Sequence, residues 1–341
     1  MKTKTITMKK LVFCLAVLIT VSCTDMFDNT NEKKEVIEDD YVQNPNAIDG
    51  AFTQGKFSVS EDKAVYFSQG NLQYREITGT WRFASNQWNY VGTQFPDSED
   101  CYGGNVAGSD NAFVTYPGYE GWIDLFQFGT SGWNSGANIY QPFSASTNCS
   151  DFYIGGSPGY GLFGKYANAD WGVYNKIING GNQAGLWRTL RCREWDYILN
   201  GRPNCEKLQA CGRINGVNGC ILLPDDWTLP DSIDFMPTPQ VPPKTEYDYT
   251  IVLNANDYTL SEWDKMEKNG AIFLPNSGSR LGTFIYSCGF GGDYWTSSTN
   301  SYDNDEYFGD DAAYLTVCFT AKTSYGLRHD AKSVRLVQDV K

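Results

Sequence analysis

The stretch that decides the fold begins Asp293-Tyr294-Trp295-Thr296-Ser297-Ser298 and ends at Val337. A polar, acidic segment, Thr299 to Asp311, follows this opening. Next comes the alternating run Ala313-Tyr314-Leu315-Thr316-Val317-Cys318-Phe319, and the stretch closes with Ser333-Val334-Arg335-Leu336-Val337. Alternation of apolar and polar residues is typical of half-buried strands, so this order predicts strand, loop, strand, loop and strand.

The composition of the chain favours one large domain with short strands and many loops. Of the 341 residues, 41% are hydrophobic, which is enough to bury a sizeable core. Aromatic residues make up 15% and 34 glycines accompany them, a mixture more typical of a loop-rich β-containing protein than of a helical bundle. The formal net charge of -13 makes nucleic acid and anionic lipid surfaces poor partners.

The chain has a single histidine, His329, and this removes several classes of site. Zinc sites built on two or more histidines are impossible. A Ser-His-Asp triad would have to use His329 as its base. We interpret His329 as an exposed loop residue and assign no metal ligands.

The N-terminus has the features of a bacterial export signal. Lys2, Lys4, Lys9 and Lys10 precede an apolar run, Leu11 to Thr20, that is too short to span a bilayer. The following Thr20-Val21-Ser22-Cys23 looks like a lipoprotein box, which predicts a signal peptide over residues 1–22 and lipidation of Cys23. The alternative is an ordinary secretory signal that is cut nearby.

Two further segments follow the signal peptide. Residues 23–50 are mostly polar and charged, which predicts a disordered tether, and residues 51–341 form the single domain. The predicted location is the bacterial cell envelope, with the protein lipid-anchored in the outer membrane and exposed at the surface. The lipid would be the protein's only contact with the membrane.

Eight cysteines remain beyond Cys23, namely Cys101, Cys149, Cys192, Cys205, Cys211, Cys220, Cys288 and Cys318. An even number in an exported protein predicts disulfides, although the spacings do not decide which cysteines pair. No Cys-x-x-Cys spacing occurs, which argues against a redox or zinc motif.

The local patterns place short strands and a few helices along the domain. Short strands are expected between Phe57 and Phe83, a hairpin over 214–224 and a buried strand over 271–275. Capping and stop signals predict helices over 170–178, 192–199 and 261–270. Five prolines between Leu229 and Tyr247 predict an extended loop. Gly159 to Gly164 matches Gly-x-Gly-x-x-Gly, but Gly155, Gly156 and Pro158 precede it, so we interpret these as turn glycines.

Four stretches, in this order, resemble motifs of a known family: Tyr66 to Tyr74, Trp187 to Trp195, Asn215 to Pro224 and Tyr294 to Val337. The corresponding family motifs read "YFSPGNLQY", "WRTL…EW", "NGVNGVILLP" and "YWSS…SVRLV". They are typical of the FISUMP branch, the major paralogous domain of bacterial surface proteins. This branch belongs to the formylglycine-generating, or sulfatase-modifying factor, superfamily.

The resemblance covers roughly residues 55 to 338 and implies a fold. That fold is α+β and C-type-lectin-like, with short antiparallel strands, two or three helices and long irregular loops. The chain departs from the family at Arg191, where relatives have a Thr or Ser helix cap. It also departs at Thr299 to Asp311, which is longer and more acidic than usual and falls where this fold often binds ligands.

The resemblance also raises an enzymatic hypothesis, a formylglycine-generating oxidase. That chemistry needs two reactive cysteine thiolates a few residues apart near the C-terminus, around a copper ion. The late cysteines here, Cys288 and Cys318, lie thirty positions apart. We therefore expect no catalysis and no cofactor.

A surface-displayed binding module is the function that the sequence favours, with a glycan or protein as its ligand. Family members with this ending vary the loop residues before "SVRLV", and tyrosine supplies contact area at low entropic cost. We expect the ligand to be bound by loops Thr299 to Asp311 and Ser324 to Asp330. The expected contact residues are Trp295, Tyr302, Asn304, Tyr307, Tyr325 and Arg328. A structural subunit of the envelope or of a fimbria-like assembly is the alternative.

The acidic segment leaves a second alternative open. Asp303, Asp305, Glu306, Asp310 and Asp311 crowd together, and calcium prefers such oxygen ligands. The spacing lacks the Gly and Glu of an EF-hand loop. A solvated acidic loop and a calcium site are therefore both compatible with the sequence.

Overall fold

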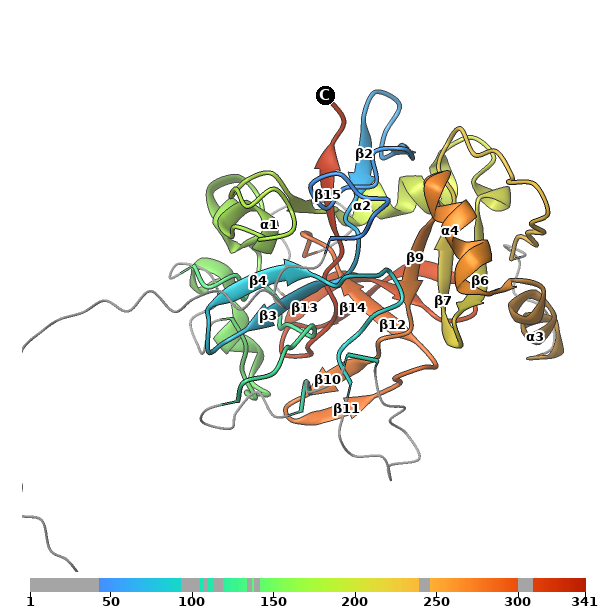
Figure 1. The fold of residues 1–341 in the computed structure, drawn as a ribbon. Coiled ribbons are helices and arrows are strands. Elements are labelled where there is room, and N and C mark those ends of the chain that lie inside the picture. The colour runs from blue at the N-terminus through green and yellow to red at the C-terminus, as the bar shows by residue number, and fades with distance from the viewer. Residues whose placement is uncertain are drawn as a thin grey trace, which may run out of the picture. The chain divides into compact units, whose positions relative to one another are not determined.

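In the computed structural model, the last strand of the chain, β15 (Leu336–Asp339), lies between two strands from distant parts of the sequence. It pairs antiparallel with β2 (Ala64–Phe67) on one side and with β5 (Arg188–Thr189) on the other. β1 (Phe57–Ser58) completes the sheet next to β2. Figure 1 shows the red β15 beside the blue β2. The beginning and the end of the domain therefore meet in one sheet.

The structure describes residues 43–92, 105–106, 110–112, 119–133, 137, 142–238, 246–299 and 309–341. All of them belong to one compact unit of the chain. Within these residues the protein is α+β, with small, mostly antiparallel sheets, few helices and long irregular connections. The predicted signal peptide, Cys23, Cys101 and residues 300–308 lie outside the described part.

The fold-deciding stretch forms the sheet β12–β13–β14 and contributes β15 to the sheet above. β12 (Gly292–Trp295) and β13 (Asp311–Val317) confirm the first two predicted strands. β14 (Ala321–Leu327) was expected to be loop, and this expectation was wrong. No residue of β14 is buried, so its sequence carries no apolar alternation to mark it as a strand.

A third sheet, in the order β8–β6–β7–β9, contains the predicted hairpin. β6 (Gln209–Ile214) and β7 (Val217–Leu222) are joined by Asn215 and Gly216, whose φ angles of 51° and 81° suit a two-residue turn. β9 (Ile272–Pro275) pairs with β7 and confirms the predicted buried strand. β8 (Asp257–Tyr258) pairs in parallel with β6.

Two small antiparallel hairpins complete the described strands. β3 (Leu72–Arg75) pairs with β4 (Thr80–Phe83), as expected for the segment before Phe83. β10 (Ser279–Leu281) pairs with β11 (Phe284–Tyr286). Isolated bridges between Tyr74 and Ile123 and between Phe126 and Lys332 attach the irregular segment around 122–126 to the strands.

The first predicted helix is capped as expected but is shorter. α1 (Trp171–Tyr174) begins after Asp170, whose carboxylate accepts a hydrogen bond from the N–H of Gly172 at 2.9 Å. It ends four residues before the predicted end because Ile177 forms a β-bridge with Trp81.

The second predicted helix is confirmed. α2 (Cys192–Asp196) continues into a π-helical turn that ends at Gly201. Arg191 occupies the cap position without a capping side-chain bond. Its N–H donates to Glu194 Oε2 at 2.8 Å, so the reciprocal half of a capping box is present.

The remaining two helices show where the local signals were misjudged. α4 (Leu260–Lys268) is capped by Thr259 with Glu262, so it begins one residue before the predicted start at 261. α3 (Glu246–Ala255) was not predicted, and the expected extended loop ended inside it. Its Tyr, Thr, Ile and Val residues are weak helix formers, which explains the omission.

Two hydrophobic cores lie on opposite faces of the fold-deciding strands. Tyr294 and Val337 belong to a core with Phe67 and Trp195 among its members, whereas their neighbours Trp295 and Leu336 belong to the other core. The second core also contains Phe126, Phe128, Trp171 and Trp187. Successive residues of a strand point to opposite faces, so β12 and β15 bury side chains on both sides.

The arginine of the closing Ser-Val-Arg-Leu-Val segment is itself buried. Arg335 Nη2 donates to Gln87 Oε1 at 2.6 Å, and Gln87 Nε2 donates in turn to Glu267 Oε1 at 3.0 Å. Glu267 Oε2 accepts a further bond from Asn46 at 2.8 Å. The side-chain amide of Gln87 therefore bonds to both the buried guanidinium of Arg335 and the buried carboxyl group of Glu267. It supplies hydrogen bonds that buried charged groups require.

The end of the predicted tether belongs to the domain, which corrects the expected boundary at residue 50. Ala47 packs into the first core, and Asn44 is buried, with its N–H donating to Gln69 Oε1 at 3.2 Å. Ile48 forms a β-bridge with Ala51. The polar composition of 43–50 predicted disorder. It could not reveal contacts with residues such as Gln69 that lie further along the chain.

Candidate functional site

Half of the predicted ligand contacts fall in the described part of the chain. Tyr302, Asn304 and Tyr307 lie outside it, as do three of the acidic residues considered for calcium. Tyr325 is 45% exposed and lies on β14 rather than on a loop. It is therefore available to contact a ligand.

Trp295 is a core residue, and this corrects its proposed role as the floor of a ligand site. The side chain is 1% exposed, and Nε1 donates to the carbonyl of Phe126 at 2.7 Å. The ring packs edge-on against Phe128, with 5.3 Å between the ring centroids. The Trp295 side chain therefore fills space in the second core.

Arg328 is also buried, so it cannot contact a ligand in this structure. Its guanidinium donates to the carbonyl oxygens of Pro158 and Tyr160 and lies 4.9 Å from the centre of the Phe128 ring. Backbone carbonyls and an aromatic face are the partners that a buried guanidinium can use. Arg328 therefore holds the 158–160 loop against the sheet.

His329 lies in a turn, as interpreted, but its side chain is not exposed. Its side chain is 12% exposed, and Nδ1 lies 3.1 Å from Cys149 Sγ. Nε2 lies 3.5 Å from Asp330 Oδ1. This contact could not be predicted from sequence, because Cys149 and His329 are 180 positions apart.

The order Cys149, His329, Asp330 is the order of a thiol nucleophile, its base and an orienting carboxylate. However, burial raises the pKa of the Cys149 thiol, and the charges of Asp310 and Asp330 raise it further. Backbone hydrogen bonds from His329 and Arg328 oppose that shift without reversing it. The environment thus favours a neutral thiol, and the thiolate is the nucleophilic form.

The five residues Gly155-Gly156-Ser157-Pro158-Gly159 match the spacing of a nucleophile elbow, Gly-x-Ser-x-Gly. An elbow needs a strand before the serine and a helix after it. Here Ser157 follows a 3-10 turn (Ile154–Gly156), and its own backbone is extended, with φ -135° and ψ 139°. The match is therefore a turn that carries Arg328's carbonyl partners.

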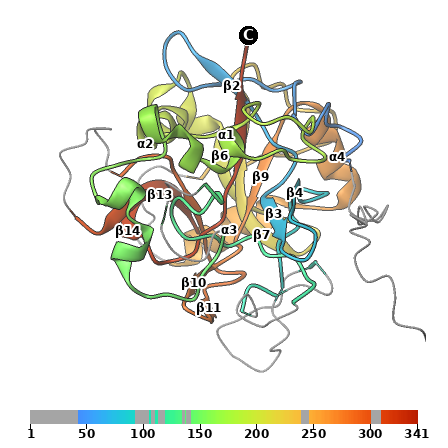
Figure 2. The same cartoon turned by 90° about the vertical axis from the view of Figure 1, so that its left-hand side faces the viewer.

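The exposed face near the predicted ligand loops is formed by the hairpin β13–β14. Phe319, Tyr325 and Leu327 are large apolar residues that this hairpin leaves exposed. Asp311 pairs with Leu327 and Ala313 with Tyr325, so both exposed side chains lie where the acidic segment enters the sheet. Figure 2 shows the hairpin at the side of the domain, close to α2.

A groove of about 930 Å³ provides a second candidate, which the sequence analysis did not single out. Arg188 lines it and forms ion pairs of 2.7 Å with both Glu194 and Asp339. Asp170 lines it too, and burial raises the pKa of this carboxyl to about 6, despite N–H donors from Thr189 and Gly172. Arg188 and Glu194 belong to the motif from Trp187 to Trp195 that resembles the family. This motif was the sequence signal that could have pointed to the groove.

Possible metal ligands do not form a cluster among the described residues. Across 43–92, 142–238, 246–299, 309–341 and the shorter described pieces, no three His, Cys, Asp or Glu side chains are grouped to hold a metal ion. In the same residues, no helix combines the length and the apolar character needed to cross a membrane. None of the seven described cysteines forms a disulfide in this structure.

Comparisons with known protein families, with curated proteins and with solved structures found no match to this chain.

Proposed function

We propose that this protein is a non-catalytic binding module of the bacterial cell surface, with a C-type-lectin-like fold of the FISUMP type. In this proposal a lipid on Cys23 anchors it in the outer membrane, and its ligand is a glycan or a protein. The sequence motifs and the α+β architecture with small antiparallel sheets support the fold assignment.

The position of Tyr325 is the observation that carries the proposal. Tyr325 is exposed, yet its backbone is paired with Ala313 in a sheet whose other strands, β12 and β13, pack into both cores. A rigid strand that presents an exposed tyrosine beside a polar segment is a common way to build a recognition site. The proposed ligand face is therefore the segment 299–311 together with the end of β14.

The thiols argue against the oxidase alternative. That chemistry uses thiolates, and burial raises the pKa of Cys149, Cys211 and Cys318. Cys288 donates to the carbonyl of Ser277 at 3.3 Å and is buried in a different cluster. These environments favour neutral thiols.

A structural subunit remains the second candidate, because β14 is an edge strand. Its partner β13 covers one side only, so alternate backbone groups of Ala321–Leu327 face away from the sheet. Such an edge can accept a strand from another chain. Isolation of the protein from envelopes in a complex of fixed stoichiometry would favour this candidate over soluble-ligand binding.

The test of the binding function uses the chain with Cys23→Ala, which we expect in the soluble fraction; retention in the membrane fraction would contradict the anchor. This protein is screened against glycans and surface proteins. Tyr325→Ala should weaken a hit by about tenfold or more, which corresponds to the loss of one aromatic contact.

Tyr174→Ala is the matched control, because Tyr174 on α1 is 42% exposed, close to the exposure of Tyr325. It should leave binding unchanged. Equal affinity of the two variants for every ligand would place the ligand face elsewhere, and the charged groove at Arg188 would be the next region to change.

A further inference from the structure

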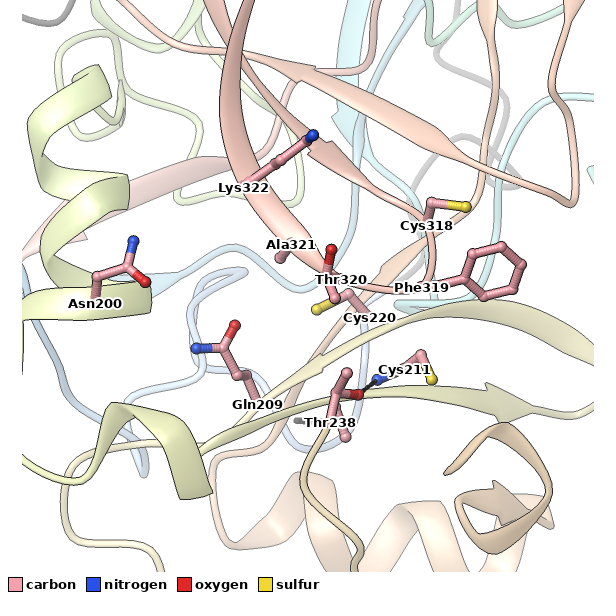
Figure 3. Close-up of a pocket in the computed structure, with 11 residues that line it drawn as sticks. Asn200, Gln209, Cys211, Cys220, Thr238, Cys318, Phe319, Thr320, Ala321 and Lys322 are labelled. Atoms are coloured by element: carbon pink, nitrogen blue, oxygen red, sulfur yellow. Dashed lines mark hydrogen bonds between the residues drawn. The ribbon is translucent and has the colours of Figure 1, made fainter. Parts of the chain in front are cut away.

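Three cysteines from two different sheets line a single cavity of about 240 Å³. Cys211 lies on β6, Cys220 on β7, and Cys318 directly after β13. Figure 3 shows the three side chains around the cavity, with Thr238 bonded to Cys211 and Phe319 next to Cys318 in the chain. The register of the β6–β7 hairpin decides which of these thiols are closest to each other.

The hairpin turn fixes that register. Asn215 and Gly216 are the only residues between the paired positions Ile214 and Val217. In a two-residue hairpin, the pair that flanks the turn is hydrogen-bonded, and the following pairs alternate between non-hydrogen-bonded and hydrogen-bonded. Counting back three pairs from the turn reaches Cys211 opposite Cys220, which is therefore a non-hydrogen-bonded pair.

The hydrogen bonds of β6 agree with this count. The N–H of Cys211 donates to Thr238 Oγ1 at 2.7 Å, and the N–H of Arg213 donates to the carbonyl of Asn256 at 2.8 Å. Both N–H groups thus point away from β7. Opposed residues at such positions have Cα atoms about 4.5 Å apart with both side chains on one face. That separation falls inside the range of about 4.4–6.8 Å that a disulfide spans.

We propose that Cys211 and Cys220 are a dithiol that oxidises to a cross-strand disulfide, while Cys318 stays a thiol at the same cavity. The ladder holds the first two opposite each other, whereas Cys318 comes from a separate sheet. Both members of the pair are thiols in this structure. The proposed site is independent of the ligand face at Tyr325.

The oxidation balances with a small disulfide such as oxidised glutathione as the oxidant. One protein thiolate attacks the glutathione disulfide and releases one reduced glutathione. The second protein thiolate then attacks the mixed disulfide, which forms the Cys211–Cys220 bond and releases the second reduced glutathione. The two protein thiols lose two protons and two electrons, and the oxidant gains them.

The experiment maps disulfides in the full chain. The protein is reduced, freed of reductant and titrated with mixtures of reduced and oxidised glutathione. The titration is run at alkaline pH, because burial raises the pKa of the Cys211 and Cys220 thiols. Remaining thiols are blocked with N-ethylmaleimide after denaturation, and tryptic peptides are analysed by mass spectrometry.

Trypsin separates the three cysteines, because Arg213 lies between Cys211 and Cys220 and many basic residues precede Cys318. The expected result is a disulfide-linked pair of peptides that contain Cys211 and Cys220, with the loss of two alkylated thiols and Cys318 still alkylated. Full alkylation of Cys211 and Cys220 at the oxidising end of the titration overturns the proposal. A link from either of them to Cys318 also overturns it.

Cys220→Ser should abolish the linked pair and leave Cys211 alkylated. Cys288→Ser is the matched control, because Cys288 is an equally buried thiol outside the cavity; it should leave the linked pair unchanged. If Cys220→Ser does not fold, the peptide map of the unaltered chain decides the question alone.

Discussion

The two outer strands of the sheet β12–β13–β14 lie in opposite environments. On β12, Tyr294 and Trp295 are buried on opposite faces, and the edge of the strand is covered because the N–H of Trp295 donates to the carbonyl of Ser333 at 3.0 Å. On β14, no residue is buried, and no other strand in the described part of the chain pairs with its outer edge. One sheet thus joins a strand that is buried on both faces to a strand that buries none of its side chains.

This difference matters for recognition because a changed surface must not unfold its support. β12 and β15 carry the two cores, and Arg335 is held inside them by Gln87. The backbones of Tyr325 and Leu327 pair with β13, and both side chains are exposed. Substitutions on β14 are therefore expected to change binding much more than folding.

The largest difference is expected between two aromatic substitutions. Trp295→Ala removes a ring that is buried between Phe128 and Tyr314, so it should lower the free energy of unfolding by about 3–5 kcal/mol. Tyr325→Ala removes an exposed ring and should change it by less than about 0.5 kcal/mol. Urea unfolding measures both, and similar losses would mean that β14 is as integral to the fold as β12.

A smaller contrast is expected between two glycines of the same sheet. A Cβ on Gly292 would lie 2.6 Å from the carbonyl oxygen of Pro275 and 3.1 Å from the N of Ser277, which are backbone atoms. A Cβ on Gly326 would lie 2.9 Å from a ring carbon of Tyr314, which can rotate away. Gly292→Ala should therefore cost about 1–3 kcal/mol of stability.

Gly326→Ala should cost less than about 1 kcal/mol, because only one side chain has to move. The midpoints of thermal unfolding, measured side by side, give the comparison. If Gly326→Ala proves the more damaging of the two, the β14 side of the sheet is packed more tightly than the structure indicates.

The smallest effect concerns Lys332, whose Nζ lies 3.2 Å from Asp293 Oδ2 at the β12 side. Burial by itself lowers the pKa of Lys332, but the charges of Asp293, Tyr286, Asp330 and Tyr314 together more than offset this, and the pKa is raised above its ordinary 10.5. A pKa that is higher in the folded state means that the stabilisation is present at neutral pH and is lost as the pH rises through the raised pKa.

Lys332→Arg keeps its charge at those pH values, so its melting temperature should fall less steeply above pH 10.5 than that of the unaltered chain. The difference between the two slopes is the measured quantity, because other groups titrate alike in both proteins. Equal slopes of melting temperature against pH in the two proteins would show that the ion pair between Lys332 and Asp293 does not stabilise the fold.

The strands with a clear apolar pattern or turn signal could be predicted from sequence, and β14 could not. β13 alternates, β9 is a short continuous apolar run, and the β6–β7 hairpin carries an Asn-Gly turn. β14 has neither, so its strand conformation depends on pairing with β13. α3 is built from weak helix formers. Its helical conformation therefore also depends on tertiary contacts more than on the helix propensity of its residues.

The candidate site shows the same limit for single residues. Tyr325 is exposed, whereas Trp295 and Arg328, which are also of residue types common in ligand contacts, are buried. Residue type does not reveal burial when the covering atoms come from Phe126 or Pro158, far along the chain. The contact between Cys149 and His329 could not be predicted from sequence for the same reason.

The position of β15 between β2 and β5 constrains how this protein is made. Its second and last strands, β2 and β15, are neighbours although nearly the whole domain separates them in the chain. Contacts of such long sequence separation slow folding, because a long loop must close before they form. The sheet cannot be completed until the final residues have been synthesised. Until β15 is present, β2 and β5 lack the strand that joins them in this sheet.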